Sequence, residues 1–195
     1  MIRALTRYGI PAMLLVGVAF VVFALFDASH QPSSANNLKR FAKGEMSKLE
    51  FGVGNSMPLD SFENANGDRI TLQDIDAKVI VLNLWFEACP PCEEEMPSLG
   101  ALQTALADDG VKVVAIALDR ANNREGNREA LADWTDGVLD FHFDHSFGMA
   151  YATKSRGMPT TILYDQYGQE QARLSGAADW ASEEAIALIR EIAAR

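Results

Sequence analysis

Two nearly unbroken apolar runs, KVIVLNLWF (78–86) and VKVVAIALD (111–119), constrain the fold of this chain more than any other feature. Apolar runs rich in β-branched residues are typical of parallel strands that are buried on both faces. Between the runs, apolar residues recur at helical spacing: Met96, Leu99, Leu102, Ala105 and Leu106. A strand, a helix and a strand in this order predict a parallel βαβ unit and therefore an α/β protein.

The remaining segments extend this pattern on both sides. The dipeptide Asn66-Gly67 lies between two short alternating runs and predicts a β-hairpin ahead of the first core strand. After the second core strand, the sequence predicts helices around 127–135 and 146–154 with a short strand in LDFHFD between them. Strands in TTILYD and QARLSG follow. The terminal segment DWASEEAIALIREIAAR is amphipathic, with acids near its start and arginines near its end, as the helix macrodipole favours.

The chain contains only two cysteines, Cys89 and Cys92, and they lie where the first core strand ends and the helix begins. Unpaired backbone N–H groups and the positive end of the helix dipole stabilise a thiolate at this position. The Cys-x-x-Cys spacing allows the second sulfur to reach the first and close a disulfide. Pro90 and Pro91 suit the first helical turn and are expected to stiffen the bridge. The pattern predicts a redox centre.

The cysteine pair has two other interpretations. A structural zinc site usually needs four ligands, and only three histidines could supplement the thiolates: His30, His142 and His145. The cysteines could also be two inert buried thiols that lie close together by coincidence. Their position at a strand-to-helix turn of a βαβ unit favours the redox centre over both alternatives.

A second motif, GMPTTILYD, places Pro159 directly before a predicted strand. Proline cannot donate to a central strand ladder, so its presence at a strand entrance needs a reason. A cis Met158–Pro159 peptide bond would supply that reason. The alternative is an ordinary trans proline that opens an edge strand.

The N-terminal segment 10–26 has 17 residues without a charge and, as a helix, would span roughly 26 Å, close to the thickness of the bilayer hydrocarbon. We expect residues 1–26 to form an uncleaved signal anchor with residues 8–26 in the membrane. Arg3 and Arg7 would place its N-terminus in the cytoplasm. A cleaved signal peptide or a buried core helix are the alternatives. Residues 27–50 are expected to be a linker with a possible short helix, and 51–195 the folded domain.

Together, WFEACPPCEEEMPSL and GMPTTILYD resemble the membrane-anchored thioredoxin-like thiol-disulfide oxidoreductases of the TlpA, ResA and CcmG group. The resemblance covers about residues 51–195, and the C-terminal tail is most similar to that of TlpA. It implies a thioredoxin-like fold, with a central mixed sheet flanked by helices and an extra N-terminal hairpin. No cofactor and no metal are implied beyond a redox-active Cys89–Cys92 disulfide.

The resemblance also implies roles for individual residues. Cys89 would be the exposed attacking nucleophile and Cys92 the resolving thiol. Glu95 matches the active-site glutamate of the group, a candidate to modulate thiol protonation, although it could simply be an acid that favours the helix dipole. Contacts with the partner protein are expected from four residues: Met158, Pro159, Thr160 and Trp85. For Trp85, a core position beneath the site is the favoured alternative. Asn83 takes the place of a buried aspartate found in ordinary thioredoxins and would support the site, as would Pro90 and Pro91.

Two departures from the group lie beside the cysteines. Ala88 stands where the group commonly has a bulky residue, and Glu93 and Glu94 stand where basic residues are frequent. Negative charge near Cys89 disfavours its thiolate. We therefore expect a higher pKa for Cys89 than a basic flank would give.

The expected function is reduction of disulfides in dedicated partners at the periplasmic face of a bacterial inner membrane. The similarity to TlpA implies copper-handling partners, either a copper chaperone or the oxidase subunit that carries the copper site. The similarity to ResA and CcmG implies apocytochrome c instead. A membrane electron donor of the DsbD/CcdA type would restore the thiols. Another alternative is a copper carrier that uses Cys89 and Cys92. The formal net charge of −10 argues against a nucleic-acid partner.

Overall fold

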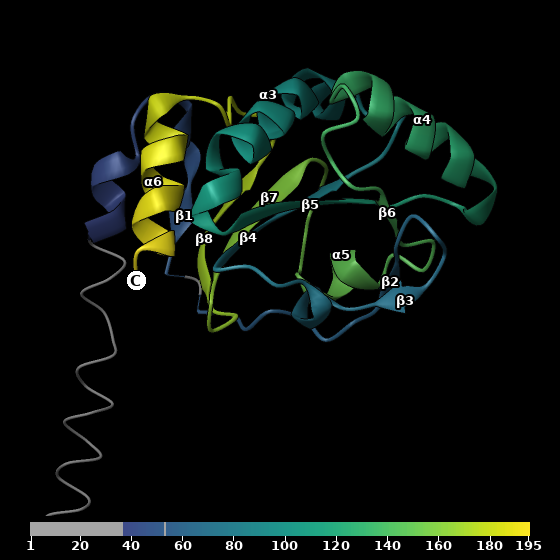
Figure 1. Ribbon diagram of the computed structural model, residues 1–195, viewed down its shortest axis with the longest axis horizontal. Coiled ribbons are helices and arrows are strands. Elements are labelled where there is room, and N and C mark those ends of the chain that lie inside the picture. Colours follow the sequence, from purple (N-terminus) through teal and green to yellow (C-terminus); the bar gives the residue numbers. More distant parts are fainter. Residues whose placement is uncertain (1–36, 53) are drawn as a thin grey trace, which may run out of the picture. The chain divides into compact units, whose positions relative to one another are not determined.

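The computed structural model describes residues 37–52 and 54–195, and these residues contain a mixed sheet of eight strands with helices on both faces (Figure 1). The order of strands across the sheet is β1-β8-β7-β4-β5-β6-β2-β3. The strands are β1 (Glu50–Phe51), β2 (Phe62–Glu63), β3 (Arg69–Ile70), β4 (Val79–Trp85), β5 (Val111–Ala117), β6 (His142–Phe143), β7 (Thr160–Asp165) and β8 (Glu170–Ser175). The predicted α/β fold with a mixed sheet is confirmed.

The centre of the sheet is the predicted βαβ unit. β4 and β5 pair in parallel from Val79↔Val111 to Trp85↔Ala117, and both strands are almost completely buried. On its other side β4 pairs antiparallel with β7, where Leu84 faces Thr160. This register places the start of β7 beside the end of β4. The segment that contains Met158 and Pro159 and the segment that leads to the cysteines therefore meet at the same edge of the sheet.

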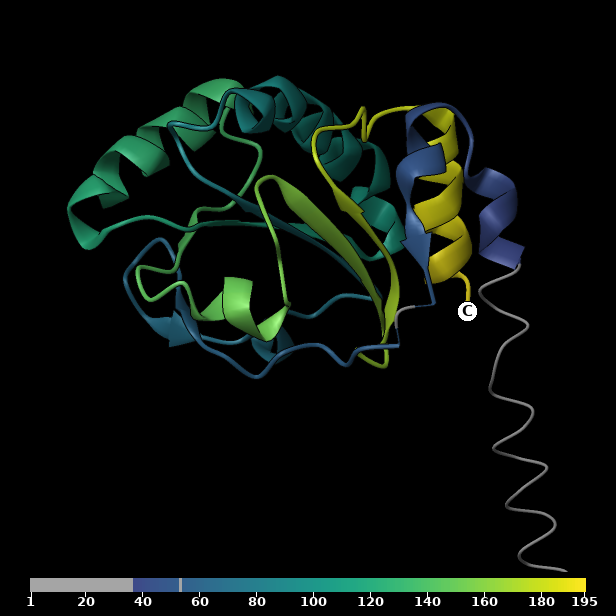
Figure 2. The same cartoon turned by 180° about the vertical axis from the view of Figure 1, so that it is seen from behind.

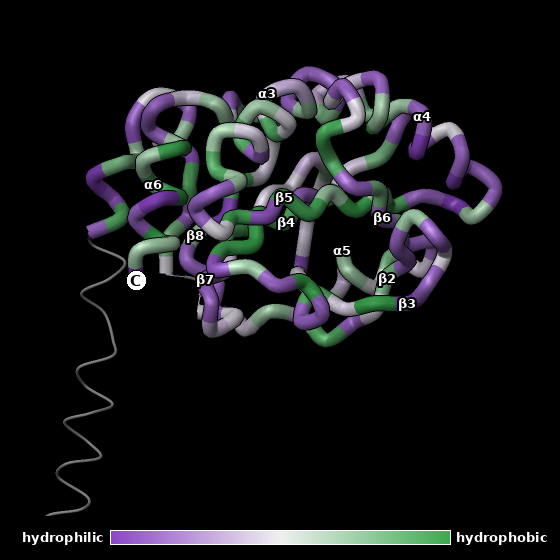
Figure 3. Tube along the Cα trace, in the orientation of Figure 1, coloured by the Kyte–Doolittle hydropathy of each residue, from purple (hydrophilic) through white to green (hydrophobic). Residues whose placement is uncertain are grey.

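Four α-helices cover the sheet within the described residues: α3 (Pro90–Leu106), α4 (Arg124–Trp134), α5 (Gly148–Ala152) and α6 (Glu183–Ala193). α3, α4 and α6 lie on one face, and the short α5 lies on the other (Figures 1 and 2). Each face has its own apolar core, and the hydrophobic residues of β4 and β5 run between the two (Figure 3). The helices expected at 127–135 and 146–154 are present with shifted ends.

Residues 38–50 belong to the folded unit, which extends from Leu38 to Arg195. They form two 3₁₀ turns, η1 (Lys39–Phe41) and η2 (Gly44–Lys48), and β1 begins at Glu50. Leu38, Met46 and Leu49 are buried in the core beneath α6 and α3. This corrects the prediction of a linker for residues 38–50, whereas 27–36 lie outside the described residues. The short helix expected in this segment is present as 3₁₀ turns. Its few apolar residues did not reveal that the segment packs against the domain.

The predicted hairpin is present as β2 and β3, which pair antiparallel. Its loop is longer than a two-residue turn. The side chain of Asn64 closes the loop by accepting hydrogen bonds from the backbone N–H groups of Asn66 and Asp68. Gly67 has a φ of +87°, a conformation that glycine adopts without steric cost. The hairpin lies next to β6 at the end of the sheet, where β2 pairs antiparallel with β6.

The predicted signal anchor over residues 1–26 lies outside the described residues. Within 37–52 and 54–195, none of the helices has the length and apolar character needed to cross a bilayer.

Candidate active site

Cys89 and Cys92 form a disulfide at the N-terminus of α3, with their Cα atoms 5.2 Å apart. Cys89 is the N-cap residue, and its carbonyl oxygen accepts the N–H groups of Cys92 at 2.9 Å and Glu93 at 3.1 Å. Pro90 and Pro91 occupy the first two helical positions, where the missing N–H groups would have had no partner within the helix. The sequence folds this way because a buried strand delivers the chain to a proline-initiated helix.

The two cysteines differ in accessibility. Cys89 keeps 5% of its surface exposed and Cys92 none. The residues beside them are exposed: Ala88, Pro90, Pro91, Glu93 and Glu94. The expectation of an exposed nucleophile is thus corrected, because Cys89 reaches solvent only through a small part of its surface. It is still the cysteine that another molecule can approach first.

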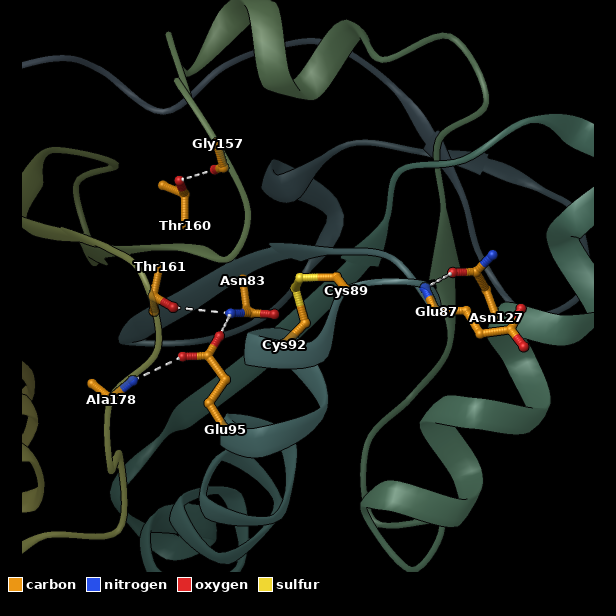
Figure 4. Close-up of a disulfide and its surroundings, with 10 residues drawn as sticks. All are labelled: Asn83, Glu87, Cys89, Cys92, Glu95, Asn127, Gly157, Thr160, Thr161 and Ala178. Carbon is orange, nitrogen blue, oxygen red and sulfur yellow. Dashed lines mark hydrogen bonds between the residues drawn. A yellow bond between two sulfur atoms is a disulfide. The ribbon is translucent and has the colours of Figure 1, made fainter.

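Beneath the disulfide lies a buried polar network centred on Glu95, one helical turn after Cys92. Asn83 Nδ2 donates to Glu95 Oε1 at 2.7 Å and to Thr161 Oγ1 at 2.9 Å (Figure 4). On the other side of the carboxylate, Glu95 Oε2 accepts from Ala178 N at 3.3 Å and from Trp180 Nε1 at 3.2 Å. The network joins β4, α3, β7 and the segment that precedes α6.

Burial raises the pKa of Glu95 to about 7, although the hydrogen bonds from Asn83, Trp180 and Ala178 act in the opposite direction. A carboxyl group with a pKa near neutrality exchanges a proton readily at the pH of most compartments. Glu95 lies in the same helix as Cys92, one turn further along. Its effect on thiol protonation stays a prediction.

The Met158–Pro159 peptide bond is cis, as the sequence analysis predicted. The carbonyl oxygen of Pro159 accepts from Gly176 N at 2.8 Å, and Thr160 Oγ1 donates to the carbonyl oxygen of Gly157 at 2.7 Å. Met158 is half-buried and lies outside the strand ladder. Within the described part of the chain, its backbone makes no hydrogen bond to another residue. That leaves the Met158 backbone available for pairing with another chain.

Three of the four expected partner contacts are buried. Pro159 and Thr160 support the loop from inside. Trp85 is completely buried and packs edge-to-face against Trp134, with ring centroids 5.5 Å apart. Trp85 therefore supports the site from below, which agrees with the core interpretation of this residue and corrects its alternative assignment as a partner contact. Only Met158 presents part of its surface.

Sequence reasoning missed a further group that holds the loop before Cys89. The N–H of Glu87 donates to Asn127 Oδ1 at 2.8 Å, and Asn127 Nδ2 donates to Asp119 Oδ2 and to the carbonyl oxygen of Asn123 (Figure 4). Asn127 is fully buried although it lies on the polar helix α4. An asparagine in a predicted helix carries no signal of such a role. Sequence reasoning also missed Thr161, Ala178 and Trp180, because nothing in their local sequence indicates contacts with Asn83 or Glu95.

Two of the three histidines considered as metal ligands, His142 and His145, lie in and after β6, and His30 lies outside the described residues. His142 is buried against the ring of Phe62, whereas His145 is half-exposed with Nε2 3.9 Å from Glu63 Oε1. Across residues 37–52 and 54–195 no group of three or more histidine, cysteine, aspartate or glutamate side chains is arranged to hold a metal ion.

A redox-active cysteine pair at a helix start, beside a cis-proline loop and over a buried carboxyl group, defines a thioredoxin-like thiol-disulfide oxidoreductase. The Redoxin family model matches residues 52–189, and the chain belongs to the Redoxin family.

Relatives and solved structures agree with this assignment. The chain is 33% identical over 124 residues to the thioredoxin-like protein YneN of Bacillus subtilis, covering 63% of this chain and 72% of YneN. It is 30% identical over 129 residues to the thiol-disulfide oxidoreductase ResA of Halalkalibacterium halodurans, covering 66% of this chain and 72% of ResA. A solution structure of a thiol:disulfide interchange protein from Bacteroides sp. has the same fold, with a TM-score of 0.61 at 18% identity over 74% of this chain and 92% of that one. The expected TlpA/ResA/CcmG group is thereby confirmed, whereas closeness to TlpA itself stays a prediction.

Proposed function

We propose that this protein is a membrane-anchored reductase that transfers electrons from Cys89 and Cys92 to disulfides in a few dedicated partner proteins. The observation that carries the proposal is the asymmetry of the pair, since Cys89 alone keeps an exposed surface while Cys92 lies behind it above Glu95. An attacking thiol must be reachable by the partner. A resolving thiol needs only to reach its neighbour.

In the reaction, the Cys89 thiolate attacks one sulfur of the partner disulfide, and the other partner sulfur leaves with the electron pair of the broken bond. Cys92 then attacks Cys89, the mixed disulfide breaks, and the partner is released with two thiols. The enzyme is left with the disulfide seen in this structure. The free backbone of Met158 supports pairing with the partner chain as an added strand during these steps.

The cellular setting is part of the proposal. Residues 8–26 would anchor the domain in a bacterial inner membrane with the redox site in the periplasm, and a donor of the DsbD/CcdA type would return two electrons to the pair. Copper-handling factors of cytochrome oxidase assembly are the proposed partners. Their cysteines bind copper only as thiols, so an oxidised partner needs a reductant first.

A trapping experiment tests the chemistry and names the partner. In the source bacterium, Cys92→Ala should accumulate Cys89 in mixed disulfides that dissociate with dithiothreitol, and mass spectrometry should identify copper-handling proteins. The Cys89→Ala/Cys92→Ala double variant is the control and should capture none. Capture of apocytochrome c would move the protein to cytochrome c maturation. Absence of any dithiothreitol-sensitive complex would refute the reductase proposal.

Two further measurements test the setting and the carrier alternative. The protein should remain in membranes after alkaline extraction, and a membrane-impermeant thiol reagent should label reduced Cys89 in intact spheroplasts. Stoichiometric copper in the reduced purified protein, lost on His142→Ala or His145→Ala, would favour a copper carrier instead.

A further inference from the structure

The amide of Asn83 is only half satisfied. Its side chain is fully buried in β4, and its Nδ2 has two acceptors, Glu95 Oε1 and Thr161 Oγ1. Its Oδ1 is also buried but has no hydrogen-bond donor within the described residues. Buried carbonyl oxygens are nearly always paired, so this atom needs an explanation.

The unpaired oxygen faces the cysteines. Asn83 lies on the same face of β4 as Val81 and Trp85, and that face forms one core with Cys89 and Cys92. Figure 4 shows the amide nitrogen turned toward Thr161 and Glu95 and the amide oxygen turned the other way, toward the disulfide. A disulfide has no proton to donate. Reduction gives Cys92 an S–H group, a hydrogen-bond donor that the disulfide lacks.

We propose that Asn83 is a positioning residue that couples the protonation of Cys92 to that of Glu95, an inference that rests on the proposed function and deepens it. With Glu95 ionised, Nδ2 stays on the carboxylate and Oδ1 accepts from the Cys92 thiol. With Glu95 protonated, its O–H becomes a donor, and the amide turns by about 180° about its Cβ–Cγ bond. Oδ1 then accepts from Glu95 and Thr161, and Nδ2 donates to the Cys92 thiolate.

The two orientations match the two sides of the resolving step. The S–H bond of Cys92 breaks and an O–H bond forms on Glu95. Cys92 Sγ bonds to Cys89 Sγ as the bond between Cys89 Sγ and the partner sulfur breaks, and the partner sulfur leaves with the electron pair. Because the amide turns with the proton, each state keeps its buried groups hydrogen-bonded.

Glu95 is buried, with 2% of its surface exposed, but it is one of the residues that line a pocket. The pocket has a volume of about 540 Å³, and the charged residues that line it with Glu95 are Glu45, Lys48, Glu94 and Asp179. Ser98 and Ala178 line the same pocket. A partner bound over Cys89 and Met158 covers a different part of the site. In this proposal the proton on Glu95 leaves through the pocket, whose lining does not include Cys89 or Met158.

The test measures how strongly Glu95 affects Cys92 with and without Asn83. In a Cys89→Ser background, the thiolate of Cys92 is titrated by its absorbance at 240 nm. Glu95→Gln should lower the Cys92 pKa by about one unit, a tenfold change in the thiolate-to-thiol ratio. In a protein that also carries Asn83→Leu, Glu95→Gln should shift the Cys92 pKa by less than a third of that amount. Thr161→Val is the matched control, because it leaves the bond between Asn83 and Glu95 intact, and should preserve the full shift.

The proposal would be overturned if Glu95→Gln shifted the Cys92 pKa equally in proteins with Asn83 and with Asn83→Leu. Equal shifts would mean that Glu95 acts by direct charge repulsion, which does not need the amide. A measurement on the unaltered protein covers the case in which Asn83→Leu does not fold. The side-chain amide NMR signals of Asn83 should move on reduction by clearly more than those of Asn127, whose oxygen already has a donor. Equal movement of both would also overturn it. Neither readout involves a partner, so failure here leaves the reductase proposal to its own trapping test.

Discussion

The indole of Trp180 donates a hydrogen bond to Glu95 Oε2 at 3.2 Å, although 85 positions separate the two residues in the chain. Trp180 is completely buried, and its own backbone N–H donates to Ser98 Oγ at 3.0 Å. The segment before α6 thus closes over the active-site helix and supplies the buried carboxyl group with donors. This contact ties the C-terminal tail to the chemistry of the cysteine pair.

Trp180→Phe should raise the pKa of Glu95 further above about 7, because it removes a donor that stabilises the carboxylate while the apolar packing is largely kept. The measurement is a ¹³C NMR titration of the Glu95 carboxyl carbon in the oxidised protein. Trp134→Phe is the control and should leave the titration unchanged. A pKa that falls in Trp180→Phe would contradict the role assigned to the indole.

Glu95 should make the oxidised protein less stable as the pH rises. Its pKa is raised from 4.5 to about 7, so between these values the folded state holds a proton that the unfolded state has released. The free energy of unfolding should therefore fall from about pH 4.5 to pH 7, by an amount on the order of 3 kcal/mol. Urea denaturation at several pH values measures it. Glu95→Gln should flatten this dependence, and an unchanged slope in that variant would assign it to another group.

Asn127→Leu should loosen the loop before Cys89. The substitution removes the acceptor of the Glu87 N–H group. A buried N–H group without an acceptor lowers the free energy of unfolding by about 1–3 kcal/mol. The reduction of a disulfide substrate should slow as well, since the loop positions the nucleophile. Denaturant unfolding and a substrate reduction assay measure the two effects. Asn122→Ala, an exposed change in the preceding turn, should alter neither.

Glu93→Lys/Glu94→Lys should lower the pKa of Cys89. Both glutamates are exposed and follow directly after Cys92, so replacing them converts a repulsive field at the Cys89 thiolate into an attractive one. The expected change is about half to one unit, limited by solvent screening. The pH dependence of Cys89 alkylation measures it at low ionic strength. Glu129→Lys/Asp133→Lys on α4 makes the same change of charge elsewhere and should have a smaller effect. A pKa that stays constant in the first variant would count against the expectation.

The local features of the site could be predicted because each depends on neighbouring residues. The continuous apolar runs of β4 and β5 required a buried parallel pair, and the helical spacing after Cys92 required the helix between them. The positions of the cysteines and of the prolines in the first turn followed directly. Pro159 before an apolar strand indicated the cis bond for the same local reason.

The accessibility of the cysteines and the state of Glu95 could not be predicted in this way. The loop around Met158 reaches the edge of the sheet where the cysteines lie only through the pairing of β7 with β4. The donors to Glu95 come from Asn83, Ala178 and Trp180, and nothing in their local sequence directs them to one carboxyl group. The packing of Leu38 and Met46 is a similar case.

The sequence by itself determined the order of the core elements, the place of the disulfide at a helix start and the chemistry that two thiols so placed can perform. It could do so because hydrophobic periodicity and backbone preferences act over a few residues. Only the tertiary structure decided how little of Cys89 meets solvent, that the carboxyl group of Glu95 titrates near neutrality, and that the oxygen of Asn83 faces the cysteines. Those properties depend on burial and on partners brought together from distant parts of the chain, which no local pattern records.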